Sequence, residues 1–157
     1  QQDVATLSGG LTRDWALSPS HDKLAYLEVA LSGDSSESRA FVLDLASGSL
    51  EPITDQSLAG FGPVWSDDGR LAVGVLDESA GKGNIEVWQD GKMAQIAGPQ
   101  PGFDVPLSFT KDGFVVRAFD GTTAAAPGRS SLVFIGANTT RQNIANGEVT
   151  YLGWTNP

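Results

Sequence analysis

Four short phrases recur along this chain at nearly constant spacing: LSP at 17–19, WSDDG at 65–69, FTKDG at 109–113 and WTNP at 154–157. Alignment on Ser18, Ser66, Thr110 and Thr155 gives steps of 48, 44 and 45 residues. Short apolar runs, rich in β-branched and aromatic residues, lie between the phrases and are separated by turn residues. A period in the forties with such runs is typical of the blades of a β-propeller.

Each repeat divides into four runs that we interpret as antiparallel strands. The first strand ends in the recurring phrase, at 15–18, 63–66 and 107–110. The other strands are expected at 24–27, 41–45 and 50–53, at 71–76, 85–88 and 93–96, and at 114–119, 132–135 and 141–144. The predicted fold class is therefore all-β, with three four-stranded repeats of about 45 residues at about 11–54, 60–97 and 103–145.

The turns and the polarity of the strands agree with this prediction. Asp-Gly pairs at 68–69 and 112–113 favour hairpin turns, because Gly readily adopts the left-handed backbone conformation. The second and third runs of each repeat are continuously apolar, as expected for strands that neighbouring sheets cover on both faces. The fourth runs are more polar and one contains Pro52, which suits an outer sheet edge.

The two ends of the sequence do not complete a repeat. We expect a stray strand at each end, at 4–7 and at 149–155, and residues 148–157 resemble the start of a further repeat. An outermost and an innermost strand are not neighbours in a blade, so these two cannot pair with each other. We interpret residues 1–157 as a single β-propeller domain or part of one, most simply part of a longer propeller. An open three-blade domain closed by self-association and a smaller ring with unusual ends are the alternatives.

The phrase WSDDGRLA at 65–72 resembles the WD40-like repeat (PD40) of TolB-type β-propellers. The first copy keeps Ser18 and Pro19 but lacks the Gly, and the third keeps KDG at 111–113. The resemblance implies a propeller that closes with six to eight blades. It is compatible with several functions, because the family includes periplasmic partner-binding proteins, lipoprotein propellers and the propellers that gate prolyl-oligopeptidase-type peptidases.

Composition excludes several classes of function. The net charge is −9 and the ten Lys and Arg residues are scattered, which argues against binding to nucleic acid. No apolar run approaches the roughly 18 residues of a membrane span, so no membrane insertion is expected. Without cysteine the chain has neither a disulfide framework nor a thiol nucleophile. Apolar end faces of the repeat array would need further blades or self-association to cover them.

No catalytic residue, cofactor site or metal site is predicted. His21 is the only histidine and falls in a turn, and no Gly-x-Ser-x-Gly nucleophile elbow occurs. Oxygen ligands at 67–69 and at 77–84 could suit calcium, but neither segment matches an EF-hand loop, and both are typical of turns. We therefore expect that the chain is not itself an enzyme.

Two segments between second and third strands break the repeat rhythm and are the candidate partner-binding loops. Residues 31–39 contribute Asp34, Ser35, Glu37 and Arg39, and residues 120–130 contribute Asp120, Thr122 and Arg129. Long loops on a propeller rim commonly bind partners, although a tolerated insertion would give the same pattern. Trp15, at the inner end of its repeat, is a candidate for the channel mouth, and blade packing is the alternative role.

The function that we expect is a non-catalytic β-propeller module that binds a protein or another macromolecule, in the periplasm or outside the cell. The alternatives are the gating propeller of a serine peptidase whose catalytic domain is absent from this sequence, and a sensor or ligand-binding domain of a lipoprotein or membrane-anchored regulator.

Overall fold

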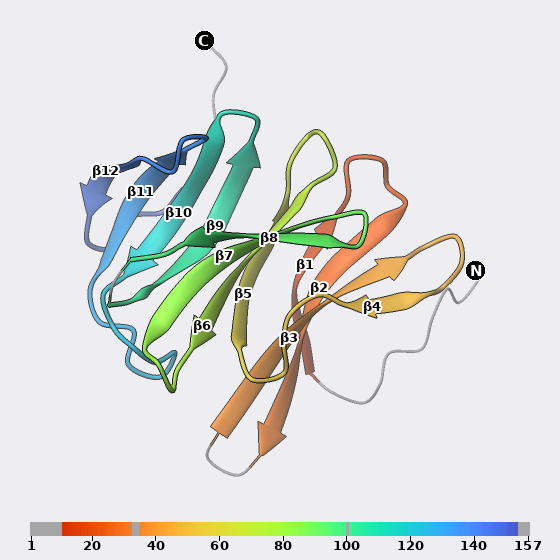
Figure 1. Ribbon diagram of the computed structural model, residues 1–157, viewed down its shortest axis with the longest axis horizontal. Coiled ribbons are helices and arrows are strands. Elements are labelled where there is room, and N and C mark those ends of the chain that lie inside the picture. The colour runs from red at the N-terminus through yellow and green to blue at the C-terminus, as the bar shows by residue number, and fades with distance from the viewer. Residues whose placement is uncertain (1–10, 33–34, 100, 154–157) are drawn as a thin grey trace.

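The computed structural model describes residues 11–32, 35–99 and 101–153 (Figure 1). This part of the chain forms twelve β-strands and contains no helix. The strands build three four-stranded antiparallel sheets that lie side by side, with the second sheet between the other two (Figure 1). The all-β class and the three four-stranded blades predicted from the sequence are confirmed.

Each sheet, or blade, uses four consecutive strands. The first blade contains β1 (Leu11–Leu17), β2 (Lys23–Ser32), β3 (Ser35–Asp44) and β4 (Leu50–Pro52). The second contains β5 (Ala59–Trp65), β6 (Leu71–Asp77), β7 (Lys82–Gln89) and β8 (Lys92–Ala97). The third contains β9 (Phe103–Thr110), β10 (Gly113–Phe119), β11 (Ser130–Gly136) and β12 (Arg141–Asn146). Strand order follows sequence order in every blade, so each connection within a blade is a hairpin.

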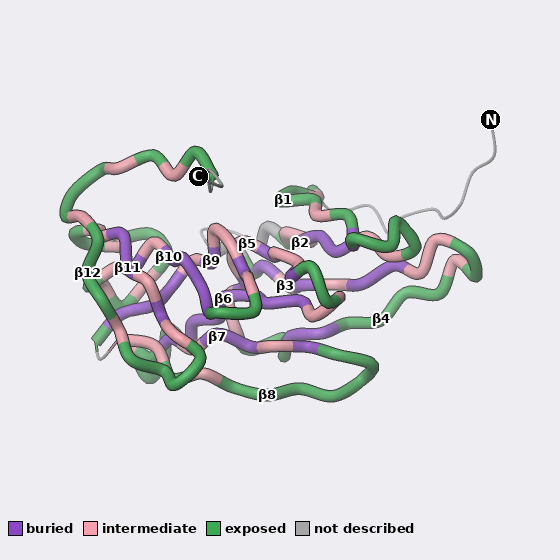
Figure 2. The backbone as a smooth tube through the Cα atoms, turned by 90° about the horizontal axis from the view of Figure 1, so that it is seen from above, coloured by how far each residue is buried: buried purple, intermediate pink, exposed green. Residues whose placement is uncertain are grey.

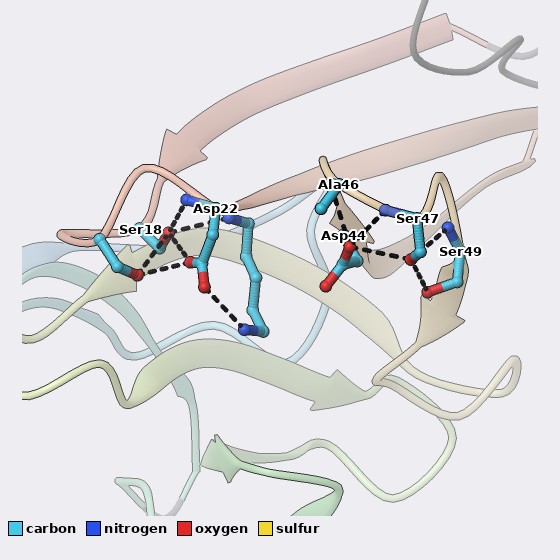
Figure 3. Close-up of polar contacts among 8 residues, drawn as sticks. Ser18, Asp22, Asp44, Ala46, Ser47 and Ser49 are labelled. Atoms are coloured by element: carbon cyan, nitrogen blue, oxygen red, sulfur yellow. Dashed lines mark hydrogen bonds and ion pairs between the residues drawn. The ribbon is translucent and has the colours of Figure 1, made fainter.

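The recurring phrase of the sequence closes the turn between the first and second strands. In the first blade the Ser18 hydroxyl accepts hydrogen bonds from the backbone N–H of Asp22 and Lys23 and donates to the Asp22 carboxylate at 2.9 Å (Figure 3). In the second blade the Ser66 hydroxyl accepts from the Arg70 N–H at 3.0 Å. Hydroxyls of Ser20 and Ser18 lower the pKa of Asp22 to about 2, because they bind its ionised form.

The turn between β3 and β4 is also closed by hydrogen bonds between a short polar side chain and the backbone, but the central residue here is an Asp and not a Ser. The Asp44 carboxylate accepts hydrogen bonds from the backbone N–H of Ala46 and Ser47 and from the Ser47 hydroxyl (Figure 3). The backbone N–H of Ser47 contributes most to the lowered pKa of Asp44. Short polar side chains therefore satisfy the backbone groups that the hairpin ladder leaves unpaired at this rim.

Successive residues of a strand point to opposite faces of the sheet. In each blade both of these faces carry apolar residues. We call the face toward the preceding blade in sequence the leading face, and the opposite face the trailing face. The trailing face of the first blade packs on the leading face of the second through Ala25, Leu27, Ala40, Val42, Leu71, Val73, Val75 and Trp88. The trailing face of the second packs on the leading face of the third through Ala72, Ile85, Phe109, Phe114, Val116, Ala118, Val133 and Ile135.

Burial decreases from these two interfaces toward the outer strands. Figure 2 shows buried backbone along β2, β6 and β10 and exposed backbone along β4, β8 and β12. In β6 every residue from Leu71 to Leu76 is buried, whereas β4 is exposed throughout. The continuous apolar runs of the sequence thus correspond to strands that are covered on two sides.

In the second and third blades, the aromatic residue that precedes the Ser or Thr of the phrase contacts the preceding blade. The indole N–H of Trp65 donates to the carbonyl of Ala16 in the first blade at 2.9 Å. Phe109 occupies the equivalent place in the third blade, and the Arg70 guanidinium of the second blade lies 4.6 Å from its ring centroid. The repeated aromatic position is therefore an interblade contact, which gives a physical reason for the spacing.

Two acidic side chains are buried within this apolar framework. Asp104 in β9 is fully buried, and Arg141 in β12 donates two hydrogen bonds to it, at 2.8 and 2.7 Å. Glu86 in β7 lies on the leading face of the second blade and accepts a hydrogen bond from the Gln95 side chain at 3.2 Å. Desolvation, with a smaller contribution from the charge of Asp55, raises the pKa of Glu86.

Two expectations from the sequence differ from the structure. Residues 31–39 do not form a long loop, because β2 and β3 pair as far as Ser32 opposite Ser35. Backbone hydrogen bonding needs no apolar side chain, so a Ser-rich segment can extend a hairpin. The strand expected at 149–155 is not formed in residues 149–153, since no other strand of the described chain pairs with them. The expected strand at 4–7 and the phrase at 154–157 lie outside the described residues.

Removal of the guanidinium that neutralises Asp104 should be costly. We expect Arg141→Met to reduce the free energy of unfolding by about 3–5 kcal/mol, because it leaves a buried carboxylate without a counter-charge. Urea unfolding followed by tryptophan fluorescence measures the difference. The control is Arg129→Met, which removes a pairing with Asp120 by a side chain that is 93% exposed and should change stability little. Equal losses in the two variants would contradict the prediction.

Glu86 should make the stability of the protein depend on pH in a defined direction. Its pKa is higher in the folded state, so the ionised form is destabilising, and this effect appears as the pH rises above the ordinary value of 4.5. We therefore expect Glu86→Gln to unfold at a higher temperature than wild type at pH 7, and the two proteins to converge as the pH falls toward 4. Glu37→Gln, at an exposed position of β3, is the control. A difference in unfolding temperature that grows as the pH falls would contradict a raised pKa of Glu86.

Candidate functional site

The three innermost strands each carry an irregularity at the same place. In β1 Asp14 and Trp15 lie opposite one residue of β2, because Arg13 pairs with Leu27 and Ala16 pairs with Ala25. In β5 the corresponding bulge contains Gly62 and Pro63, and in β9 Leu107 is the extra residue. Asp14 and Gly62 have φ of 53° and 48°, a left-handed conformation that Asp and Gly tolerate better than most residues do.

The bulges bring equivalent residues from three strands together at the inner edge of the blades. Trp15, Pro63 and Leu107 each stand three residues before the Ser or Thr of the repeated phrase. All three line two adjoining cavities, so they form the boundary between them. The pair of cavities follows the inner strands from one rim of the blades toward the other, and we call it the inner groove.

The first cavity of the inner groove has a volume of about 440 Å³ and is lined mainly by aromatic residues and prolines. Its residues come from all three inner strands, from β10 and from the β10–β11 loop: Arg13, Asp14, Trp15, Phe61, Gly62, Pro63, Phe103, Val105, Pro106, Leu107, Phe119, Ala124 and Pro127. Phe103 stacks against Phe61 of the second blade with ring centroids 4.8 Å apart, and against Phe119 at 5.0 Å. The stack therefore continues across the boundary between two blades.

The second cavity has a volume of about 580 Å³ and contains more polar groups. It is lined by Trp15, Ala16, Leu17, Ser18, Pro19, His21, Pro63, Val64, Trp65, Asp67, Leu107, Ser108 and Phe109. His21 lies in the turn after β1 with φ of 59°, and its backbone N–H donates to the Ser18 carbonyl. Its imidazole makes no hydrogen bond to any residue that the structure describes.

Trp15 lies at the centre of the inner groove, where the sequence predicts a channel mouth. Its side chain stacks on Tyr26 with ring centroids 4.8 Å apart, and 47% of the residue remains exposed. Tyr26 in turn stacks on Phe41 at 5.8 Å, so the indole is held from one side by an aromatic column. Because almost half of the residue stays exposed, the supported indole can serve as a preformed contact surface.

The inner groove has few charged side chains, and the Arg13–Asp14 pair among them is partly exposed to solvent. Arg13 and Asp14 form an ion pair of 3.8 Å beside Trp15, with about half of each side chain exposed. In the described part of the chain no group of three or more His, Asp or Glu side chains could hold a metal ion. The arrangement is suited to apolar and proline-rich contacts with one polar pair at the side.

The loop at 120–129 forms one wall of this site and is internally hydrogen-bonded. Asp120 accepts from the backbone N–H of Arg129 at 2.7 Å and from its side chain at 3.0 Å, and the backbone bond contributes most to the lowered pKa of Asp120. The backbone N–H of Ala124 donates to Glu78 in the β6–β7 turn at 2.7 Å. Thr122 is exposed next to the same turn. Of the two candidate loops, this one therefore reaches the inner groove, through Ala124 and Pro127.

The candidates in the other segment lie elsewhere. Ser35, Glu37 and Arg39 belong to strand β3 and not to a loop, which corrects the expectation from the sequence. Arg39 donates from Nε to the Thr54 carbonyl at 3.0 Å, and its guanidinium lies 5.5 Å from the Phe41 ring centroid. Asp34 lies outside the described residues. Neither Glu37 nor Arg39 lines the inner groove.

Sequence reasoning did not identify the aromatic stack of Phe61, Phe103 and Phe119. The sequence contains a usable signal, since Phe61 and Phe103 both lie within ten residues upstream of a recurring phrase, on the strands that line the channel of a propeller. Their contact depends on how two blades are oriented, which no local pattern specifies.

Solved structures with the same fold were found, although no family model and no curated protein match the sequence. TolB of Acinetobacter baumannii aligns with a TM-score of 0.59 and 17% identity over 86% of this chain and 32% of its own. A TolB-type protein of Agrobacterium tumefaciens aligns with a TM-score of 0.68 and 17% identity over 90% of this chain and 53% of its own. The chain thus has a TolB-like β-propeller fold and spans about a third to a half of these proteins.

Dipeptidyl peptidase 4 of Porphyromonas gingivalis also aligns, with a TM-score of 0.45 and 12% identity over 85% of this chain and 31% of its own. A score at this level gives no support to the peptidase alternative. No helix in the described residues is long and apolar enough to cross a membrane.

The bulge in β5 should be intolerant of a side chain. A Cβ at Gly62 would lie 2.8 Å from the Pro106 carbonyl and 2.9 Å from Val105, in addition to the strain of a positive φ. We expect Gly62→Ala to lower the free energy of unfolding by about 3 kcal/mol. Gly91→Ala is the matched control, because Gly91 also has a positive φ but no atom within 4 Å of the new Cβ, and about 1–2 kcal/mol is expected. Similar losses in urea unfolding would show that contact with β9 is unimportant.

Proposed function

We propose that this chain is a non-catalytic β-propeller module that binds a protein partner through the inner groove. The observation that carries the proposal is the convergence of Trp15, Phe61 and Phe103 from three inner strands on one cavity of about 440 Å³. Concave apolar sites with a few polar groups at the margin are the usual form of a binding site. Aromatic side chains supply large contact areas with little loss of conformational entropy.

The shape and chemistry of the inner groove favour an extended peptide segment as the ligand. Three prolines and four aromatic residues line the first cavity, and the second cavity continues it along the same strands. Grooves with aromatic walls commonly bind Pro-containing or apolar peptide segments, whose restricted backbone reduces the entropy lost on binding. Arg13 and Asp14 would fix the orientation of such a segment through its charged or backbone groups.

We also propose that the module acts in the periplasm or outside the cell. The support is the resemblance of the repeated phrase to TolB-type repeats together with the TolB-like fold. The same observations are compatible with a domain of a lipoprotein or membrane-anchored regulator. In such a protein the inner groove would be the sensing site. No specific observation favours a gating role in a peptidase.

A random peptide library displayed on phage tests the proposal with the immobilised 157-residue chain. We expect enrichment of peptides with Pro or aromatic residues, and calorimetry with the synthetic peptides should give micromolar dissociation constants. Trp15→Ala should weaken binding at least tenfold, equivalent to about 1.4 kcal/mol. Met93→Ala, at a position in β8 with comparable exposure, should have no effect. Failure of the library to enrich peptides, or equal affinity of Trp15→Ala and wild type, would refute the proposal.

A further inference from the structure

One wall of the inner groove belongs to the third blade but is bonded to the second. The β10–β11 loop at 120–129 contributes Ala124 and Pro127 to the first cavity. The turn between β6 and β7 of the second blade lies at the same rim (Figure 1), and the Glu78 carboxylate in this turn accepts a hydrogen bond of 2.7 Å from the Ala124 N–H. These two residues are 46 positions apart in the sequence, so the contact exists only because the two blades are packed together.

The loop is closed at its base by hydrogen bonds of its own. Backbone bonds join Asp120 to Arg129 and Gly121 to Pro127, and the Asp120 carboxylate accepts from the Arg129 N–H at 2.7 Å. Residues 124–126, at the tip, are exposed. The internal bonds fix the shape of the loop but not its position against the neighbouring blade. A segment with little buried apolar surface depends on its polar contacts to stay in place.

Two contacts join the loop to the second blade. The first is the bond from Ala124 to Glu78, and within the residues that the structure describes no other hydrogen bond links the loop to that blade. The second is the approach of Thr122 to Gly81, where an added Cβ would lie 3.2 Å from the Thr122 Cβ. Gly81 lets the loop come close to the turn, and Glu78 supplies the directional bond. A hydrogen bond to an ionised acceptor is stronger than one between neutral groups.

The turn that carries Glu78 is itself ordered by a second carboxylate. Asp77 accepts hydrogen bonds from the backbone N–H groups of Ser79 and Ala80 at 3.0 Å each, and from the Ser79 hydroxyl at 2.6 Å. The Ser79 hydroxyl contributes most to the lowered pKa of Asp77. Because these bonds hold the backbone on the C-terminal side of Glu78, the turn is a firm support for a contact with the loop.

We propose that Glu78 is a positioning residue of the inner groove, which holds the 120–129 loop where Ala124 and Pro127 complete the first cavity. Glu78 lines neither cavity, so it acts on a bound peptide through the loop and not by contact. This inference rests on the function proposed above. Without the bond, the cavity would lose a fixed wall, and the free energy of ordering the loop would oppose the binding of a peptide.

Hydrogen exchange of the 157-residue chain, followed by NMR, tests the positioning without a ligand. We expect the Ala124 amide to exchange at least about tenfold faster in Glu78→Ala than in wild type, because it loses its acceptor. Glu78→Gln keeps a side-chain oxygen and should retain most of the protection. Glu37→Ala, which removes an exposed carboxylate from β3, is the control for charge and should change nothing. Unchanged exchange in Glu78→Ala would refute the positioning role, whatever the groove binds.

Calorimetry with a synthetic peptide that the wild-type chain selects from the phage library tests the consequence for binding. We expect Glu78→Ala to weaken binding at least about fivefold, and Glu78→Gln and Glu37→Ala to weaken it less than about twofold. Equal affinities of Glu78→Ala and wild type would overturn the effect on binding. Failure of the library to yield a peptide would refute the proposed function and with it the effect on affinity, whereas the exchange experiment decides separately whether Glu78 positions the loop.

A disulfide distinguishes positioning from a direct effect of the negative charge on the peptide. The 3.2 Å between a Cβ at Gly81 and the Thr122 Cβ is close to the ~3.5–4.5 Å found in disulfides, and the chain has no cysteine of its own. In the Glu78→Ala background, Gly81→Cys with Thr122→Cys should bind the peptide with wild-type affinity after oxidation by oxidised glutathione, and should bind it weakly again after reduction. Weak binding by the cross-linked variant, or failure of the cross-link to form, would overturn the proposal.

Discussion

The packing of one blade face on the next is the interaction on which the rest of this structure depends. Each sheet is apolar on both faces, so a single blade cannot bury its own surface, and the two cores exist only because three blades are stacked. The aromatic residue of the repeated phrase serves this contact directly, through the Trp65 bond to Ala16 and the Arg70 contact with Phe109. Strand pairing determines the shape of each blade, and the packing between blade faces determines how the blades lie relative to one another.

The inner groove is a consequence of this placement. Bulges in β1 and β5 tilt Trp15 and Pro63 out of the regular ladder, but they meet Leu107 only because the three blades are held side by side. The stack of Phe61 on Phe103 connects the cavity wall to the second interface. A change in the blade packing would therefore alter the binding surface, and rigid sheets keep that surface preformed in the absence of a ligand.

Polar groups in this molecule are organised differently at the rim and in the interior. At the rim, the exposed Asp22 and the half-buried Asp44 accept hydrogen bonds from turn N–H groups and hydroxyls, which lowers the pKa of both carboxyls. In the interior, Asp104 is neutralised by Arg141 from the opposite edge of the same blade, whereas Glu86 has only an amide partner. The rim carboxylates stabilise hairpins locally, and the interior pair joins the inner to the outer strand.

The sequence by itself determined the repeat, the four-strand division of each blade and the positions of the turns, because these follow from local periodicity and from Ser, Asp and Gly chemistry. It misassigned residues 31–39, since a Ser-rich hairpin is stabilised by backbone pairing that side-chain pattern does not reveal. Only the tertiary structure decided that Phe61 meets Phe103 and that Asp104 meets Arg141. Those contacts join residues of different strands or blades, and their geometry depends on sheet twist and on the angle between blades.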